Sequence, residues 1–234
     1  MTRHVVVTGG TGEVGKQLLA LLAARPGLSV RALVRRSGTT PLAPNIQEVP
    51  FDFEDAAAYG PLFAQPCDLL LIALGTTRAK AGSDEAFLRV DRDYPLRLLS
   101  ALAATHPEAA VGLVSSVGAD RARGLYLGAK AAVEEELTTL RLTHAIARPS
   151  FLRSDRSEFR LAEVLVDRLL SPLWLVLGRA LFPHSQGWWR WAPIHVREVA
   201  TALLEATLTL EPGERRILEG LDLHTGPVAR WGRP

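Results

Sequence analysis

The amino-acid sequence predicts an α/β fold in which one parallel sheet is covered by helices on both faces. Short apolar runs alternate along the chain with longer segments of helical spacing, which is typical of repeated strand–helix–strand units. The first run, Val5-Val6-Val7-Thr8, leads into glycines at Gly9, Gly12 and Gly15. A strand, a glycine-rich turn and a helix in this order favour dinucleotide binding. We therefore expect a Rossmann-type, doubly wound sheet.

The glycine-rich turn is the predicted pyrophosphate site. A backbone that passes close to a pyrophosphate has no room for side chains and needs positive φ angles, which favours glycine. The alternative is a tight connection without a ligand, but the apolar strand at 4–8 and the helical spacing at 14–24 favour phosphate binding. The residues expected to contact the cofactor here are Gly9, Gly10, Thr11, Gly12, Glu13, Val14 and Gly15.

Composition narrows the function classes. With 234 residues, 47% of them hydrophobic and 22% charged, the chain suits one globular domain. The formal net charge is only +2 and arginines are dispersed, so we expect no nucleic-acid partner. Cys67 is the sole cysteine and no secretory signal is apparent, which indicates the cytoplasm. Apolar runs fall short of the roughly 20 residues of a membrane span. Scattered histidines predict no metal site.

The end of the second predicted strand, at 28–34, indicates which cofactor is bound. Arg35 and Arg36 follow it directly, where an acidic residue would bind the ribose 2′-hydroxyl of NAD(H), and no acidic residue occurs before Glu48. Guanidinium groups suit a 2′-phosphate, so the sequence predicts NADP(H). The alternative is a pair of solvated surface arginines.

Two further strand ends are expected to line the cofactor. A third strand at 46–51 is followed by Asp52 and Phe53, which could bracket the adenine. A buried strand at 68–74 is followed by a polar loop at 78–84. Helices are expected at 56–63 and 87–105. The residues predicted to contact the cofactor after the buried strand are Leu74, Gly75, Thr76 and Thr77.

The strand predicted at 111–116 carries the candidate catalytic chemistry. It ends in Ser115 and Ser116, and parallel sheets place ligand sites at such ends. Tyr126 and Lys130 follow at i and i+4 on one helix face. The ammonium group stabilises a phenolate, so Tyr126 could exchange a proton while Lys130 also reaches the ribose hydroxyls. Ser116 would orient the substrate oxygen and Ser115 would contact the cofactor, although which serine faces the substrate stays open.

The strand at 142–148 leads into Arg148, Pro149, Ser150 and Phe151, which are expected over the nicotinamide, the alternative being an ordinary strand end. Regular alternation then stops. We expect residues 1–151 to form the dinucleotide-binding core and 152–234 mainly a small substrate lobe and C-terminal elements, within a single domain. In that part, His195 is expected to begin the helical run at 199–208, the tryptophans at 188, 189 and 191 to be core, and 225–234 to be a loose tail.

Several runs carry a family resemblance: residues 74–82, 89–94, 115–120 and 126–130, with Arg148-Pro149 and Asp155-Arg156. They resemble the atypical branch of the short-chain dehydrogenase/reductase superfamily, and within it the Tat-interacting oxidoreductase-like (CC3-like) family. The resemblance implies an NADP(H)-binding domain with Ser116 (or Ser115), Tyr126 and Lys130 in reductase positions, and it implies no particular substrate.

The leading functional hypothesis is an NADP(H)-dependent oxidoreductase that transfers hydride to or from a carbonyl or alcohol substrate. One alternative is a non-catalytic NADP(H)-sensing regulator with a protein partner. A third is a nucleotide-sugar epimerase or dehydratase, for which the chain after Leu152 looks short. The sequence leaves open whether the protein is a monomer or a homodimer.

Overall fold

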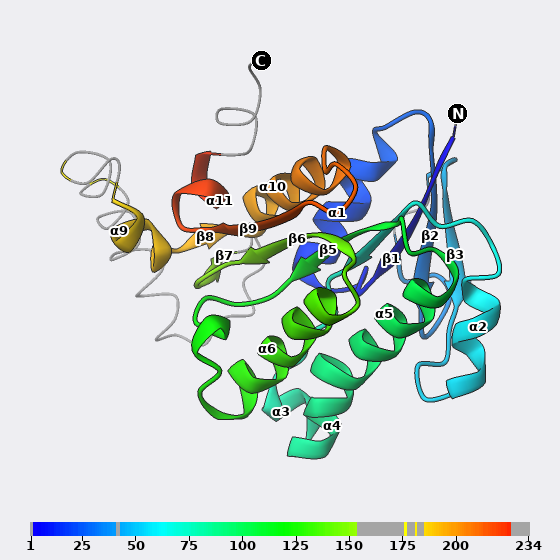
Figure 1. The fold of residues 1–234 in the computed structure, drawn as a ribbon, viewed down its shortest axis with the longest axis horizontal. Coiled ribbons are helices and arrows are strands. Elements are labelled where there is room, and N and C mark those ends of the chain that lie inside the picture. Colours follow the sequence, from blue (N-terminus) through cyan, green and yellow to red (C-terminus); the bar gives the residue numbers. More distant parts are fainter. Residues whose placement is uncertain (1, 41–42, 154–175, 177–180, 182–184, 226–234) are drawn as a thin grey trace.

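The structure is a computed structural model that describes residues 2–40, 43–153, 176, 181 and 185–225. Its main sheet has seven strands in the order β3-β2-β1-β4-β5-β6-β9, and every neighbouring pair is parallel (Figure 1). The order reverses between β1 and β4, where doubly wound sheets bind ligands. The predicted fold class is confirmed. The strands are β1 (Arg3–Thr8), β2 (Leu28–Val34), β3 (Ile46–Pro50), β4 (Leu69–Ile72), β5 (Ala110–Val114), β6 (Thr143–Arg148) and β9 (Arg215–Glu219).

Helices cover both faces of this sheet (Figure 1). On one face, α1 (Glu13–Ala23) and α10 (Val196–Leu208) pack on Val5 and Val7, and on the other, α5 (Tyr94–Thr105) and α6 (Gly124–Thr139) pack around Val6. Successive strand residues point to opposite faces, so the unbroken valine run supplies both cores. This is why the strands appear in the sequence as continuous apolar runs.

The remaining elements are short. They are η1 (Ala56–Ala58), α2 (Tyr59–Leu62), α3 (Arg78–Ala81), α4 (Asp84–Leu88), the π-helical segment η2 (Arg89–Asp93), η3 (Ala119–Arg121), β7 (Leu152–Arg153), α9 (Gln186–Arg190), β8 (Ile194–His195) and α11 (Leu221–Thr225).

Three expectations need correction. The polar loop expected at 78–84 contains α3, which Thr77 begins by accepting a hydrogen bond from Lys80 N at 3.2 Å. The single helix expected at 87–105 is α4, a π-helical segment and α5. The region after Leu152 also contains a seventh strand, β9. That strand lies at the sheet edge and alternates exposed with more buried side chains, so it lacks the apolar run that marks inner strands.

The C-terminal part confirms one further prediction and part of another. His195 begins α10 as its N-cap: its ring Nδ1 accepts from Arg197 N, and its backbone N–H donates to the Glu198 carboxylate, both at 3.2 Å. Trp189 packs in a small core with Ala192 and Leu221, and Trp188 is partly buried against it. The prediction of a core position is wrong for Trp191, which is half-exposed. Residues 226–234 of the expected tail lie outside the described residues.

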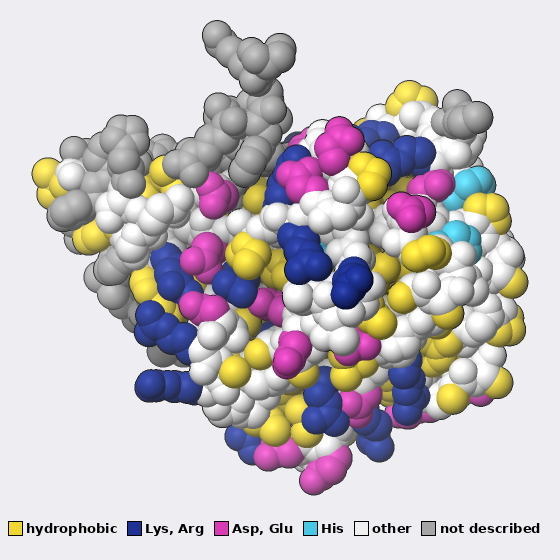
Figure 2. All heavy atoms as spheres, viewed as in Figure 1, with side chains coloured by type: hydrophobic (Ala, Val, Ile, Leu, Met, Phe, Trp, Pro, Cys, Tyr) yellow, Lys and Arg dark blue, Asp and Glu magenta, His cyan; other side chains and the backbone are white. Residues whose placement is uncertain are grey.

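The surface is mixed in charge. On the face in Figure 2, basic and acidic side chains of the described residues are interspersed. Within the described ranges no helix is long and apolar enough to cross a membrane, and no group of three metal-binding side chains occurs.

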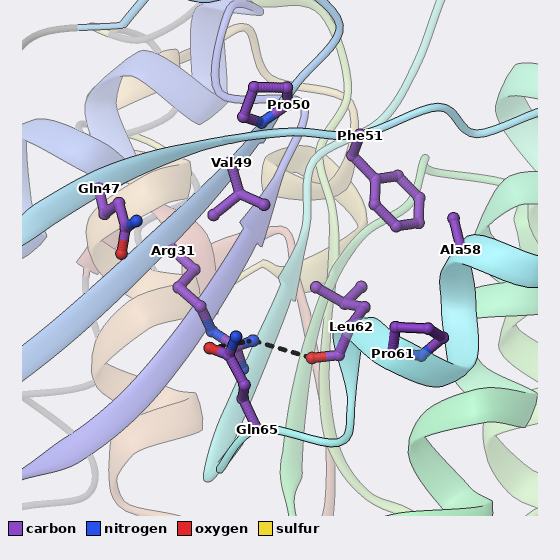
Figure 3. A pocket seen from close by; sticks show the side chains of 9 residues that line it. All are labelled: Arg31, Gln47, Val49, Pro50, Phe51, Ala58, Pro61, Leu62 and Gln65. Atoms are coloured by element: carbon purple, nitrogen blue, oxygen red, sulfur yellow. Dashed lines mark hydrogen bonds between the residues drawn. The ribbon is translucent and has the colours of Figure 1, made fainter.

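A hollow of about 360 Å³ lies over β2 and β3, beside α2 (Figure 3). Arg31 points into it from β2 and is 9% exposed. Its guanidinium donates to the carbonyls of Leu62 and Pro66, each at 2.8 Å, so it closes the C-terminal end of α2. Burial lowers the pKa of Arg31. This capping role explains why Arg31 is buried, and no ligand is needed to explain it.

Candidate functional site

The glycine-rich turn is built so tightly that side chains would not fit. Gly9 has a φ of +75°, and a Cβ there would collide with the carbonyl oxygen of Ala73 at the end of β4. A Cβ at Gly15 would collide with the carbonyl oxygen of Gly9. The turn is closed by a hydrogen bond from Gly12 N to Gly9 O at 2.9 Å. Glycine is therefore required for the turn to pack against both β4 and α1.

The turn leaves room for an anion at the start of α1. Thr11 and Gly12 are exposed, and Gly12, the N-cap, supplies no side-chain acceptor to the helix. Glu13 and Val14 begin the helix, and Gly10 is buried against Leu19. Backbone N–H groups at a helix N-terminus suit phosphate oxygens. The geometry thus fits the predicted pyrophosphate site.

At the adenosine end, Arg35 and Arg36 are exposed directly after β2. Asp52 is exposed, and its carboxylate accepts from Glu54 N at 2.9 Å. Phe53 differs from the prediction: its ring is 6% exposed and stacks on Tyr94, with 5.3 Å between the ring centroids. The Phe53 ring belongs to the core because a short aromatic cluster forms there, and it offers no open surface to an adenine.

A buried ion pair fixes Lys130 at the end of β4. Lys130 Nζ lies 2.9 Å from Asp91 Oδ1 and donates to the Leu74 carbonyl at 3.4 Å. Asp91 Oδ2 accepts from Thr76 N at 2.8 Å. A Cβ at Gly75 would lie 3.8 Å from Lys130 Nζ. The structure therefore brings Lys130 together with the predicted residues 74–76. Thr77 caps α3 nearby.

Asp91 was not singled out from the sequence. It is 1% exposed and lies in the π-helical segment between α4 and α5. The wider π turn changes which side chains face inward. The sequence did contain a signal for Asp91: it is an acidic residue directly after Val90, within an amphipathic run that continues to Tyr94. A carboxylate on the buried face of such a run needs a partner.

Tyr126 and Lys130 share α6, as predicted. Tyr126 is 44% exposed, and its ring lies beside Phe87 with 6.1 Å between centroids. The two serines differ. Ser115 is buried and donates a short hydrogen bond to Glu134, whereas Ser116 is half-buried and its hydroxyl makes only a 3.5 Å contact with the Val117 carbonyl. Of the two hydroxyls, that of Ser116 is therefore the more available to a substrate.

Arg148 has a different partner from the predicted one. Its guanidinium binds the Glu134 carboxylate, with Nη2 to Oε2 at 2.6 Å and Nε to Oε1 at 3.1 Å, and both side chains are nearly buried. The Glu134 hydrogen bonds raise the pKa of Arg148. The side chain joins β6 to α6, and Glu134 occupies the guanidinium that was predicted to face the cofactor. Sequence periodicity could not show this, because the partner lies on another element.

The residues after Arg148 lead to the small β7–β8 pair. Pro149 is buried, and its carbonyl accepts from Val117 N at 2.9 Å. Ser150 donates a short hydrogen bond to the Ala192 carbonyl, and Phe151 is 72% exposed. The segment thus connects the strand end that carries Ser116 with the C-terminal part of the chain. Residues 155 and 156 of the family resemblance lie outside the described residues.

The sheet order, the glycine-rich turn and the Lys130 site define the class: an NAD(P)H-binding protein with an oxidoreductase-type Rossmann fold. Comparison with known sequences supports the same class of protein. Residues 9–167 match the family described as NAD(P)H-binding, and the chain belongs to that family.

Individual relatives support the family resemblance. Protein HTATIP2 of Rattus norvegicus is 33% identical over 233 residues, covering 96% of this chain and 89% of that protein. A Coccidioides immitis protein named "Protein FMP52, mitochondrial" is 30% identical, covering 97% and 95%. The predicted membership of the Tat-interacting oxidoreductase-like group is confirmed.

Solved structures share the fold at lower identity. A short-chain dehydrogenase from Burkholderia cenocepacia in complex with NADP has a TM-score of 0.63 at 19% identity, covering 98% of this chain and 94% of that one. The Bordetella bronchiseptica enzyme WbmH in complex with NAD+ has a TM-score of 0.68 at 16% identity, covering 94% and 75%. At such identity the likeness establishes the fold alone.

Proposed function

We propose that the protein is an NADP(H)-dependent oxidoreductase that interconverts a carbonyl compound and the corresponding alcohol. The observation that carries the proposal is the placement of Lys130: a buried carboxylate holds it at the end of β4, one helical turn from the exposed Tyr126. A lysine in a nucleotide-binding crevice, beside a phenol that solvent can reach, suits proton transfer to a substrate oxygen.

Each side chain has one role in this scheme. NADP(H), when bound, would supply or accept a hydride at the substrate carbon. Ser116 donates a hydrogen bond that orients the substrate oxygen. In reduction, the Tyr126 hydroxyl gives its proton to that oxygen, and in oxidation the phenolate takes the proton back. Lys130, one helical turn from that phenol, would bind the ribose hydroxyls. Asp91 keeps the ammonium group in place.

Replacing Tyr126 tests the catalytic assignment. Tyr126→Phe should retain NADPH binding but lose turnover of a responsive carbonyl by roughly 100-fold or more, since general acid catalysis contributes about 10²–10⁴-fold. The measurement is NADPH oxidation across a panel of carbonyl compounds. Tyr59→Phe is the control, because it removes the same hydroxyl from a buried site where it donates to the Phe53 carbonyl and cannot reach a substrate. Unchanged turnover in the Tyr126 variant would reject the assignment.

Binding without chemistry would favour the regulatory alternative. If the wild-type protein binds NADPH but turns over no carbonyl or alcohol in the panel, a cofactor-sensing role becomes the better hypothesis. A nucleotide-sugar epimerase or dehydratase would show itself by conversion of a sugar nucleotide without net consumption of cofactor.

The preference for NADP(H) over NAD(H) is a separate part of the proposal. It is supported by the exposure of Arg35 and Arg36 at the end of β2 and by guanidinium–phosphate complementarity. Calorimetry should show tighter binding of NADPH than of NADH, and the double variant Arg35→Ser/Arg36→Ser should remove most of that difference. Equal affinity of the wild-type protein for both would overturn this part.

Location and assembly also remain proposals. We propose a cytoplasmic monomer or homodimer whose residues 1–234 form one domain. The fungal relatives carry "mitochondrial" in their names, so fractionation of the source cells must include mitochondria where these exist. Light scattering of the purified protein would give its mass in solution.

A further inference from the structure

The loop that follows β2 is folded around the carboxylate of Glu48. Glu48 lies on β3, and its side chain accepts hydrogen bonds from three successive backbone N–H groups: Gly38 at 2.5 Å, Thr39 at 2.9 Å and Thr40 at 2.6 Å. The Thr40 hydroxyl donates a fourth bond at 2.7 Å. Successive N–H groups that converge in this way form a nest for an anion, and Gly38 adopts the required positive φ of +77°.

This loop joins two parts of the predicted cofactor site. It begins directly after Arg35 and Arg36, and the Thr39 hydroxyl donates to the Arg36 carbonyl at 2.9 Å. At its other end Thr40 is buried, and its methyl group lies 3.6 Å from the position of a Cβ on Gly10 in the glycine-rich turn. The loop therefore spans the distance between the pyrophosphate turn and the arginines. Its shape decides where the backbone of Arg36 lies.

The electrostatics at this loop disfavour a ribose hydroxyl as ligand. Glu48 is the first acidic residue after the arginines, but hydrogen bonds from Thr40, Gly38 and Thr39 occupy its oxygens. The Thr40 hydroxyl and the backbone N–H groups of Gly38 and Thr40 lower the pKa of Glu48 to about 2, so it stays ionised at neutral pH. In the described part of the chain, Arg35 and Arg36 form no ion pair, with Glu48 or with another carboxylate. Their charges are available to an anion.

We propose that Glu48 is a positioning residue for cofactor discrimination. It does not touch the cofactor. It holds residues 37–40 so that Arg35 and Arg36 face the adenosine ribose, and it thereby favours a cofactor that carries a 2′-phosphate. This inference rests on the proposed NADP(H) specificity and adds the residue that enforces it.

The test uses ligands that differ only in the 2′-phosphate. The Kd values of 2′,5′-ADP and 5′-AMP are measured by calorimetry for the wild type and for Glu48→Gln, with NADPH and NADH as a second pair. An amide has one accepting oxygen and would point an NH₂ group at backbone donors. We expect 2′,5′-ADP and NADPH to bind roughly tenfold more weakly, corresponding to about one charge-assisted hydrogen bond. The Kd values of 5′-AMP and NADH should change less than about twofold.

Two further variants complete the experiment. Glu108→Gln makes the same chemical change at an exposed residue before β5 and should leave all four Kd values unchanged. Thr40→Val removes only the hydroxyl donor and keeps a methyl group against Gly10. It should weaken 2′,5′-ADP selectively by roughly two- to fourfold, and it keeps the proposal testable if Glu48→Gln does not fold.

The outcomes separate the two proposals. If the wild type does not prefer 2′,5′-ADP over 5′-AMP, the NADP(H) specificity is wrong and the positioning role falls with it. If the wild type has this preference and both variants keep it, only the role of Glu48 is wrong. Equal weakening of all four ligands would also reject that role, because it would show that Glu48 only stabilises the loop.

Discussion

The two ends of the predicted cofactor crevice are built differently. At the pyrophosphate and adenosine end, the backbone shapes the site: glycines allow close packing, a loop closes around Glu48, and the arginines are exposed. At the nicotinamide end, buried ion pairs join side chains from different elements, Lys130 with Asp91 and Arg148 with Glu134. The glycine-rich turn should therefore be sensitive to added bulk, and the nicotinamide end to the loss of a charge.

The largest effect is expected at the buried pair behind the nicotinamide end. Arg148→Leu leaves the Glu134 carboxylate without its cation and should reduce the free energy of unfolding by about 3–5 kcal/mol. Urea denaturation at pH 7 measures this. The double variant Arg148→Leu/Glu134→Leu should recover part of the loss, because removal of both charges leaves no unpaired ion, while the buried Ser115 hydroxyl loses its acceptor. A loss below about 1 kcal/mol for the single variant would show that the pair behaves like a surface salt bridge.

Added bulk should disrupt the glycine-rich pyrophosphate turn. Gly15→Ala places a Cβ against the Gly9 carbonyl and should destabilise the protein by about 2–3 kcal/mol, because the turn and α1 must separate. NADPH binding should weaken strongly in calorimetry.

Gly128→Ala provides the matched control for Gly15→Ala. Gly128 lies inside α6, and a Cβ added there would meet nothing within 4 Å, so alanine should stabilise the helix by about 0.5–1 kcal/mol. Similar thermal denaturation curves for the two variants would contradict the steric explanation of the turn.

Charge removal beside Lys130 should have a smaller effect that falls on chemistry. Asp91→Asn keeps an oxygen for Thr76 N but leaves the ammonium group without a counter-ion. We expect kcat to fall roughly tenfold, because the ammonium group is no longer held in place, while the Kd of NADPH changes less than about threefold. Asp93→Asn, two residues away and paired with Arg92, is the control. A change in Kd alone would show that Asp91 serves binding and not proton transfer.

The smallest effect concerns acid stability at the Glu48 loop. The pKa of Glu48 is about 2 in the folded protein, below the ordinary value of about 4.3 for an unfolded chain. A lowered pKa contributes stability above the unfolded value, and this contribution is lost as the pH falls from about 5 towards 2. Urea denaturation should therefore show that the free energies of unfolding of the wild type and of Glu48→Gln become more similar as the pH falls over that range. If the difference between the two free energies of unfolding does not change with pH, ionisation of the Glu48 carboxylate is not the source of the stability difference.

The sequence by itself determined the elements whose cause is local. The glycine spacing predicts the turn because steric limits act within a few residues, and the buried strands were visible because both faces of each are apolar. Tyr126 and Lys130 were placed together because helical geometry relates i to i+4. These patterns predicted the fold class, the phosphate-binding turn and the candidate catalytic helix.

Only the tertiary structure decided which side chains meet across elements. Asp91 and Lys130 are 39 positions apart, and Glu134 draws both Ser115 and Arg148 away from the roles predicted for them. The edge strand β9 and the buried ring of Phe53 were also beyond sequence patterns. The physical reason is that a buried charge or hydroxyl must find a partner, and that partner is chosen by how the sheet and helices pack.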